Sequence, residues 1–166
     1  MRVLGIDPGS ETLGWGVVEG SSARYALVDF GTIKGRSGDA FSKRLLNAYL
    51  GVEELIEKFA PDVLSVEDTF VSVNARSALK IGQVRGVVIL LGEQRSIEIA
   101  EYAPRLVKQT VVGHGNAEKH QVAEMVRVLL KLRAVPKPHD ASDALAVAIC
   151  HFHHAGLAGK LKAAKK

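Results

Sequence analysis

The sequence has only one cysteine, Cys150, among its 166 residues. A single cysteine excludes a disulfide framework within the chain, and it leaves a zinc site without the spaced cysteines that such sites commonly use. No apolar run approaches the roughly 18 residues needed to cross a membrane. Asp7 interrupts the apolar N-terminal segment too early for a signal peptide. We therefore expect a cytoplasmic protein without a membrane partner.

A nucleophile motif is also lacking, because the chain contains no G-x-S-x-G elbow for a Ser-His-Asp site. Three histidines gather late in the sequence, at His151, His153 and His154. We expect them to form a solvated helix end that interacts with the helix C-terminus, not a set of metal ligands. Any catalytic chemistry must then depend on other side chains.

Charge is spread unevenly along the chain. Residues 1–70 contain 7 Lys/Arg and 11 Asp/Glu, whereas residues 71–166 contain 15 and 7. Such asymmetry suits a protein that meets a polyanion with one part of its surface and concentrates acids elsewhere. Four of the excess lysines lie in the Ala/Gly/Lys-rich segment 157–166, which we expect to be a disordered basic tail after one domain at residues 1–156.

Turn residues and apolar periodicity divide the chain into ten elements. The predicted strands are Arg2–Asp7, Gly14–Glu19, Arg24–Ile33, Asp62–Glu67 and Ile97–Tyr102. The predicted helices are Phe41–Phe59, Asn74–Gln94, Pro104–Val112, Asn116–Lys131 and Asp140–His154. Strands joined by tight turns pair antiparallel, and strands separated by long helices pair parallel. The order predicts an α/β fold, a mixed five-stranded sheet with helices on both faces.

Four carboxylates stand at the ends of these elements. Asp7 and Glu67 each finish an apolar strand, and Asp140 and Asp143 share one face at the start of the last helix. If the first and fourth strands are neighbours, Asp7 and Glu67 project from the same rim of the sheet. Each acid also has an ordinary alternative role, since Asp7 could be a turn residue and Asp140 or Asp143 a helix cap.

Convergence of four carboxylates would favour a site for cations, because the acids repel one another strongly unless cations hold them together. Ligand sets made only of oxygen select Mg²⁺ or Mn²⁺. Two such ions would activate a water molecule and stabilise the leaving oxygen of a phosphodiester, without a nucleophilic side chain.

Five segments of the chain resemble the RuvC family of Holliday-junction resolvases in sequence, order and spacing. They are residues 5–9 (GIDPG), 66–70 (VEDTF), 78–86 (ALKIGQVRG), 103–109 (AP, then VKQ) and 140–146 (DASDALA). The resemblance covers residue 1 to about residue 154. It implies an RNase H-like fold, cleavage of four-way junction DNA with two Mg²⁺ ions per subunit, a homodimer, and cooperation with the RuvA–RuvB branch-migration complex.

The same resemblance implies roles for single residues. By motif position, the metal ligands and catalytic groups are Asp7, Glu67, Asp140 and Asp143. Some relatives carry histidine at the Asp140 position, and His139 is adjacent here, so either residue could be the ligand.

DNA contacts implied by the resemblance involve five residues, which are Phe70, Arg76, Lys80, Lys108 and Lys119. Phe70 would stack on or wedge between bases at the junction, although it could instead pack in the core. The lysines could also be ordinary exposed side chains. His120 stands where family members have a second basic residue, which reduces the charge there. Gly82 and Gly86 would let a twin helix approach the helix Asn74–Gln94 in a dimer.

Three other functions fit parts of the pattern. Actin-like ATPases and sugar kinases share the strand order, but they need a duplicated unit and a hinge for which 166 residues leave no room. A noncatalytic junction-binding module would tolerate loss of the carboxylates, and all four are present. A different DNA- or RNA-processing nuclease on the same fold is the third alternative.

Overall fold

The structure, a computed structural model, describes residues 1–36, 38–68 and 75–163. Ten elements follow one another in the order predicted from the sequence. They are β1 (Arg2–Asp7), β2 (Thr12–Ser21), β3 (Arg24–Lys34), α1 (Phe41–Phe59), β4 (Val63–Glu67), α2 (Ala75–Gln94), β5 (Glu98–Tyr102), α3 (Pro104–Val112), α4 (Lys119–Leu129) and α5 (His139–Ala163).

All five strands form one sheet in the order β3-β2-β1-β4-β5. The short turns after β1 and β2 make β1–β2 and β2–β3 antiparallel, whereas β1–β4 and β4–β5 are parallel. The prediction of a mixed sheet is confirmed. The first and fourth strands are direct neighbours, as the convergence of Asp7 and Glu67 requires.

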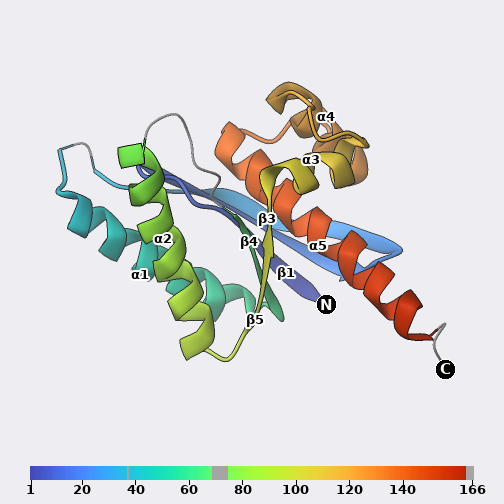
Figure 1. Cartoon of the computed structure of the whole chain (residues 1–166), viewed down its shortest axis with the longest axis horizontal. Helices are drawn as coiled ribbons and strands as arrows, with labels where there is room; N and C mark the ends of the chain where they lie inside the picture. Colours follow the sequence, from blue (N-terminus) through green and yellow to red (C-terminus); the bar gives the residue numbers. More distant parts are fainter. Residues whose placement is uncertain (37, 69–74, 164–166) are drawn as a thin grey trace.

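Helices cover both faces of the sheet, with α1 and α2 on one side and α3, α4 and α5 on the other (Figure 1). Alternation along β1 supplies the two cores, because successive side chains of a strand point to opposite faces. Val3 packs with residues of α3, α4 and α5. Its neighbour Leu4 packs with residues of α1 and α2. Each described core residue of β1 therefore packs against one of the two helical layers.

Helix α5 lies unusually close to the sheet. A Cβ atom on Gly5 would stand 2.1 Å from the carbonyl oxygen of Ala144, and one on Gly14 would stand 2.0 Å from that of Asp140. Both glycines therefore permit a backbone approach that any side chain would block. The hydroxyl of Ser65 on β4 also donates to the carbonyl oxygen of Val147, at 3.0 Å. These contacts fix the first turns of α5 at the rim where β1 and β4 end.

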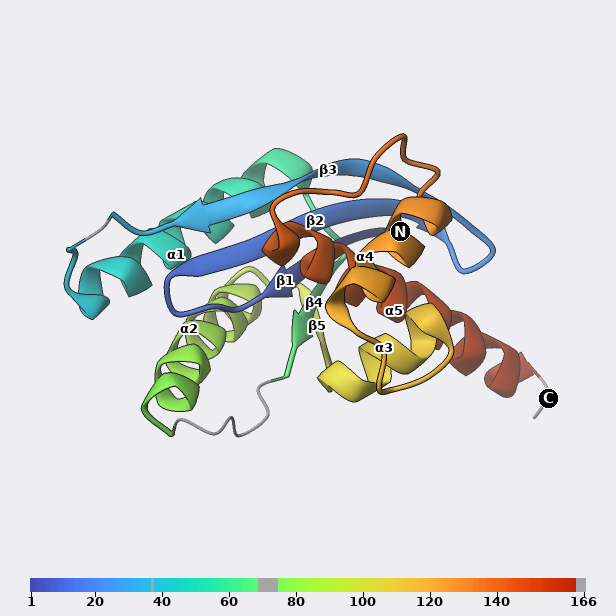
Figure 2. The same cartoon turned by 90° about the horizontal axis from the view of Figure 1, so that it is seen from above.

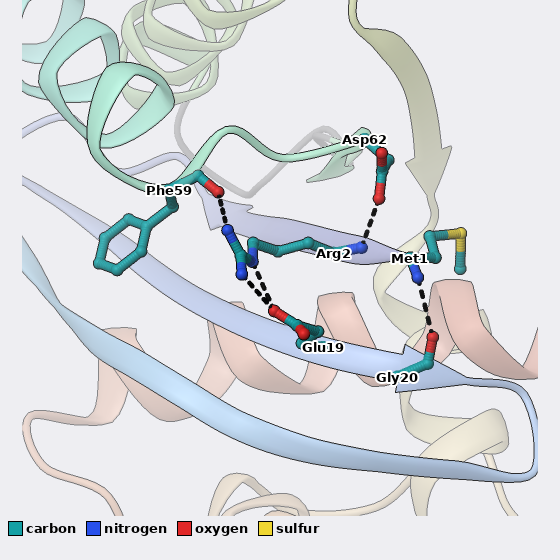
Figure 3. A network of polar contacts seen from close by, with 6 residues as sticks. All are labelled: Met1, Arg2, Glu19, Gly20, Phe59 and Asp62. Atoms are coloured by element: carbon teal, nitrogen blue, oxygen red, sulfur yellow. Dashed lines mark hydrogen bonds and ion pairs between the residues drawn. The ribbon is translucent and has the colours of Figure 1, made fainter.

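The opposite end of β1 is held by a polar network around Arg2 (Figure 3). The Arg2 guanidinium donates to the Glu19 carboxylate on β2 and to the carbonyl oxygen of Phe59 at the end of α1. Its backbone N–H donates to the Asp62 carboxylate at 2.6 Å. The N-terminal amine of Met1 donates to the carbonyl oxygen of Gly20, at 3.1 Å. The network joins β1, β2 and the α1–β4 connection.

The predicted bounds of the last two helices were wrong. Helix α4 starts at Lys119, because Glu118 and Gln121 form a reciprocal capping box, and Asn116 is not its cap. Helix α5 ends at Ala163, not at His154, so it continues into the segment 157–166. The division of the chain at residue 156 stays a prediction. Among the described residues, no helix is both long enough and apolar enough to span a bilayer.

The histidines of α5 were also placed wrongly. His151 is buried, and its Nδ1 lies 3.0 Å from the Tyr102 hydroxyl of β5. His153 Nε2 lies 3.1 Å from the Tyr25 hydroxyl of β3. Burial lowers the pKa of both imidazoles below the ordinary histidine value. These histidines are packed against strands, not solvated at a free helix end.

Candidate active site

The first two carboxylates meet because of strand pairing. Ile6 of β1 is paired with Val66 of β4 in a parallel register, so the next residues, Asp7 and Glu67, end adjacent strands side by side. Their carboxyl groups lie within hydrogen-bonding reach of each other when one of them is protonated. The sequence prediction that both acids project from one rim is confirmed by this register.

Two further carboxylates come from the start of α5. Asp143 lines the same cavity as Asp7 and Glu67. Asp140 does not line that cavity, but it lies close enough for its charge to raise the pKa of Asp7. His139 is the first residue of α5 and is exposed. The choice between Asp140 and His139 as a ligand therefore stays a prediction.

The cavity between these elements has a volume of about 200 Å³. Lysines enter it from two short helices, Lys108 from α3 and Lys119 from α4. Apolar side chains complete the wall, and these are Pro104, Val107, Val122 and Ala146. An acidic floor and a partly basic wall suit a site that holds cations and accepts an anionic substrate.

Burial and mutual repulsion make the two strand acids difficult to ionise. The pKa of Asp7 rises from 3.8 to about 7, first because of burial and then because of the charges of Asp143 and Asp140. The pKa of Glu67 rises from 4.5 to about 8, first because of burial and then because of Asp7 and Asp143. The positive charge of Lys119 partly offsets both shifts. The positive charge of Lys119 is therefore too small to balance the effect of burial and of the neighbouring acids on Asp7 and Glu67.

Lys119 contacts one of the acids directly. Its Nζ lies 3.3 Å from Asp143 Oδ2, and the charge of Asp143 is the main reason that the pKa of Lys119 is raised. The lysine side chain is mostly exposed, whereas that of Asp143 is mostly covered. Lys119 thus reaches into the cavity from its mouth.

The acids fit a divalent metal by their chemistry, since oxygen donors with unbalanced negative charge select hard cations. Their present arrangement is paired instead, Asp7 with Glu67 and Asp143 with Lys119. Within the described ranges, no group of three or more His, Cys, Asp or Glu side chains is placed to hold one ion. Binding of a cation would require these pairs to rearrange.

Two of the other predicted DNA-contact residues, Arg76 and Lys80, do not line the cavity. Arg76 and Lys80 are on α2, and Lys80 Nζ lies over the Phe41 ring, 5.5 Å from its centroid. Phe70 lies outside the described residues, so its predicted role is untested. Gly82 and Gly86 lie on the same helix, and a Cβ atom at either would meet nothing within 4 Å among the described atoms.

Arg85 was quoted only as part of a motif, without a role. Its guanidinium forms ion pairs with Asp68, at 3.3 Å, and with Glu101 of β5. Asp68 follows Glu67 directly, and its backbone N–H donates to the carbonyl oxygen of Tyr102 at 2.9 Å. Arg85 is therefore a positioning residue for the end of β4. In the sequence, this role was indicated only by a charged residue within an apolar helix pattern and by its place in the motif at residues 78–86.

Comparison with known proteins gives three concordant matches. The family model for crossover junction endodeoxyribonuclease RuvC matches residues 3–151. The RuvC of Chloroflexus aurantiacus is 46% identical over 93% of this chain and 94% of its own length, and that of Azorhizobium caulinodans is 47% identical over 99% and 96%. The chain belongs to the RuvC family.

The solved structure of Thermus thermophilus RuvC in complex with a Holliday junction substrate is similar in three dimensions, with a TM-score of 0.89 and 34% identity over 95% of this chain and 96% of that one. The RNase H-like fold expected from the sequence is confirmed by this match. RuvC family membership makes the chain a crossover junction endodeoxyribonuclease, which hydrolyses phosphodiester bonds in DNA. It also implies dependence on a divalent metal.

Proposed function

We propose that the chain resolves four-way DNA junctions with Mg²⁺ held by Asp7, Glu67, Asp143 and Asp140. The observation that carries the proposal is one cavity in which two strand-end acids, one α5 acid and two lysines meet. The structural similarity to T. thermophilus RuvC, solved with a Holliday junction substrate, supports the choice of DNA.

The chain's own residues have separable tasks in this cavity. Asp7 and Glu67 hold the cations at the sheet rim, and Asp143 holds them from α5. Lys108 and Lys119, on the opposite wall, contact the phosphate next to the cut. When bound, two divalent ions supply an activated water and charge stabilisation for the leaving oxygen.

The active species in this proposal is a homodimer that pairs through α2. Leu79 and Leu90 of α2 are 70% and 56% exposed, and no described atom lies within 4 Å of a Cβ atom placed on Gly82 or Gly86. A hollow of about 620 Å³ adjoins the same stretch of helix. Leu79 is thus available to a second copy. Two copies would place two carboxylate clusters around one junction.

The remaining assignments extend the proposal beyond the cavity. Arg76 and Lys80 would contact the DNA backbone, and Phe70 would wedge or stack at the junction centre. Cooperation with the RuvA–RuvB complex and location in the cytoplasm belong to the same proposal.

Metal dependence can be tested with a labelled four-way junction and a linear duplex of the same sequence. We expect cleavage of the junction in Mg²⁺, with Mn²⁺ substituting, and no cleavage in EDTA. Ca²⁺ should allow binding with little turnover, because its looser coordination positions an attacking water poorly. Efficient cleavage in EDTA, or equal cutting of the duplex, would rule out the proposed function.

A further inference from the structure

A hollow lined mainly by basic residues lies at the end of β3, apart from the carboxylate cavity. Its volume is about 200 Å³. Its lining contains three basic residues, Lys34, Arg36 and Arg44, and one acid, Glu11. Thr12 and Gly35 complete the lining. Lys34 and Arg36 are exposed. The described ion pairs of this hollow involve Arg44 but not Lys34 or Arg36.

Sheet register places this hollow near the scissile site. Asp7 is paired with Gly14 on β2, and Thr12 of β2 is paired with Lys34 on β3. Lys34 is therefore separated from Asp7 by two strand spacings across the sheet, which is roughly 10 Å. It is also displaced by two residues along the strand direction, which is roughly 7 Å. The two positions lie on the order of 12 Å apart along the same sheet rim.

The two basic regions flank the carboxylates. In Figure 2 the connection from β3 to α1 lies beyond the β1–β2 turn, whereas α3 and α4 lie on the other side of the start of α5. Lys108 and Lys119 belong to α3 and α4. A strand of DNA whose phosphate is at the carboxylates would thus continue toward Lys34 on one side.

Arg44 is held in place before any ligand arrives. Its side-chain stem packs against Gly35, where a Cβ atom would stand 2.9 Å from Arg44 Cγ. Its Nε is buried without a hydrogen-bond partner among the described residues. Its ion pair with Glu11 spans 3.7 Å, and the Glu11 side chain is 82% exposed. An exposed pair of this kind contributes little, so Arg44 keeps most of its capacity for an anion.

The neighbouring helix adds positive charge at the same end of the molecule. The first turn of α1 contains Lys43 and no acidic residue. Lys80 of α2 lies over Phe41, the first residue of α1. Asp39 is the nearby acid in the β3–α1 connection, and its backbone N–H donates to the carbonyl oxygen of Arg36, at 3.2 Å. Cations therefore outnumber acids here.

We infer that Lys34, Arg36 and Arg44 form a second phosphate-binding site for the DNA backbone, on the side of the active site opposite Lys108 and Lys119. The inference rests on the proposed function. A DNA strand carries one phosphate per about 3.4 Å of helix axis, so the phosphate bound here lies a few nucleotides from the cut. Such contacts fix the position of the DNA and carry no base specificity.

The test compares two double variants with the same charge change. Lys34→Ala/Arg36→Ala removes two cations from the hollow. Arg24→Ala/Lys58→Ala removes one exposed cation each from β3 and α1 at their opposite ends. Dissociation constants for a four-way junction are measured in Ca²⁺ at several salt concentrations. Loss of two phosphate contacts should reduce the slope of log affinity against log salt by about 1–2, and the control variant should keep the wild-type slope.

Equal slopes for the two double variants would overturn the second site, including when both fall equally, because a general charge effect would then suffice. Thermal melting of both variants checks that folding is retained, as expected for exposed side chains. Failure of the wild type to bind or cut the junction is a different outcome, and it would reject the proposed function instead.

Discussion

Glu67→Gln is expected to abolish junction cleavage and, at the same time, to stabilise the metal-free protein. Cleavage should fall by more than about 100-fold, since even residues that only support a metal ligand are worth about 10–100-fold. Junction binding should persist, because affinity comes from cations that face phosphates. Glu54→Gln, which makes the same change at an exposed position of α1, is the control for both effects.

The expected gain in stability follows from the raised pKa of Glu67, from 4.5 to about 8, and of Asp7, from 3.8 to about 7. At a pH between the ordinary and the raised pKa of each acid, the folded protein binds more protons than the unfolded chain. The free energy of unfolding therefore falls as the pH rises from about 4 to about 8. Glutamine removes this penalty and relieves Asp7. The free energy of unfolding at pH 8 should rise by about 2–4 kcal/mol, because each pKa unit corresponds to about 1.4 kcal/mol and burial of the glutamine amide offsets part of the gain.

Thermal melting in EDTA at pH 5 and pH 8 measures the gain, which should be larger at pH 8. Adding Mg²⁺ should stabilise the wild type more than the variant, since the variant loses a charged ligand. A Glu67→Gln protein that cuts junctions at more than a few per cent of the normal rate would show that Glu67 has no catalytic role.

Gly86→Leu is expected to separate the dimer into folded monomers that make uncoordinated single nicks. A Cβ atom at Gly86 meets nothing within 4 Å in the described chain, and leucine is preferred over glycine in a helix by about 0.5–1 kcal/mol. The isolated chain should therefore be as stable as the wild type or slightly more stable. Any loss of association must then come from contact with a second copy.

Light scattering at micromolar concentration measures the association. Glu54→Leu, which adds the same side chain at an exposed position of α1, should remain dimeric. A Gly86→Leu protein as dimeric as the wild type would exclude this interface. A wild type that is monomeric and still makes coordinated double cuts would exclude the dimer altogether.

Much of the fold followed from local patterns. Helix α1 was predicted with its observed ends, Phe41 and Phe59, because a five-turn apolar period is closed by Pro61. Asp7 and Glu67 were predicted to project from one rim on the condition that the first and fourth strands are neighbours, which the strand order confirms. Local periodicity was sufficient for the ends of α1, whereas the order of the strands in the sheet came from the structure.

Other errors came from contacts between residues far apart in the sequence. The burial of His151 depends on Tyr102, 49 residues earlier, and no local pattern reports that contact. The hollow at Lys34 was missed because Arg44 reaches it from a different element.

The most direct test labels each of the four strands of one junction in turn and maps the cuts made by the wild type in Mg²⁺. The proposal predicts nicks in two opposite strands at symmetry-related positions of the same molecule, with the matched linear duplex left intact. Cuts confined to one strand, or scattered equally over junction and duplex, would contradict a dimeric junction resolvase.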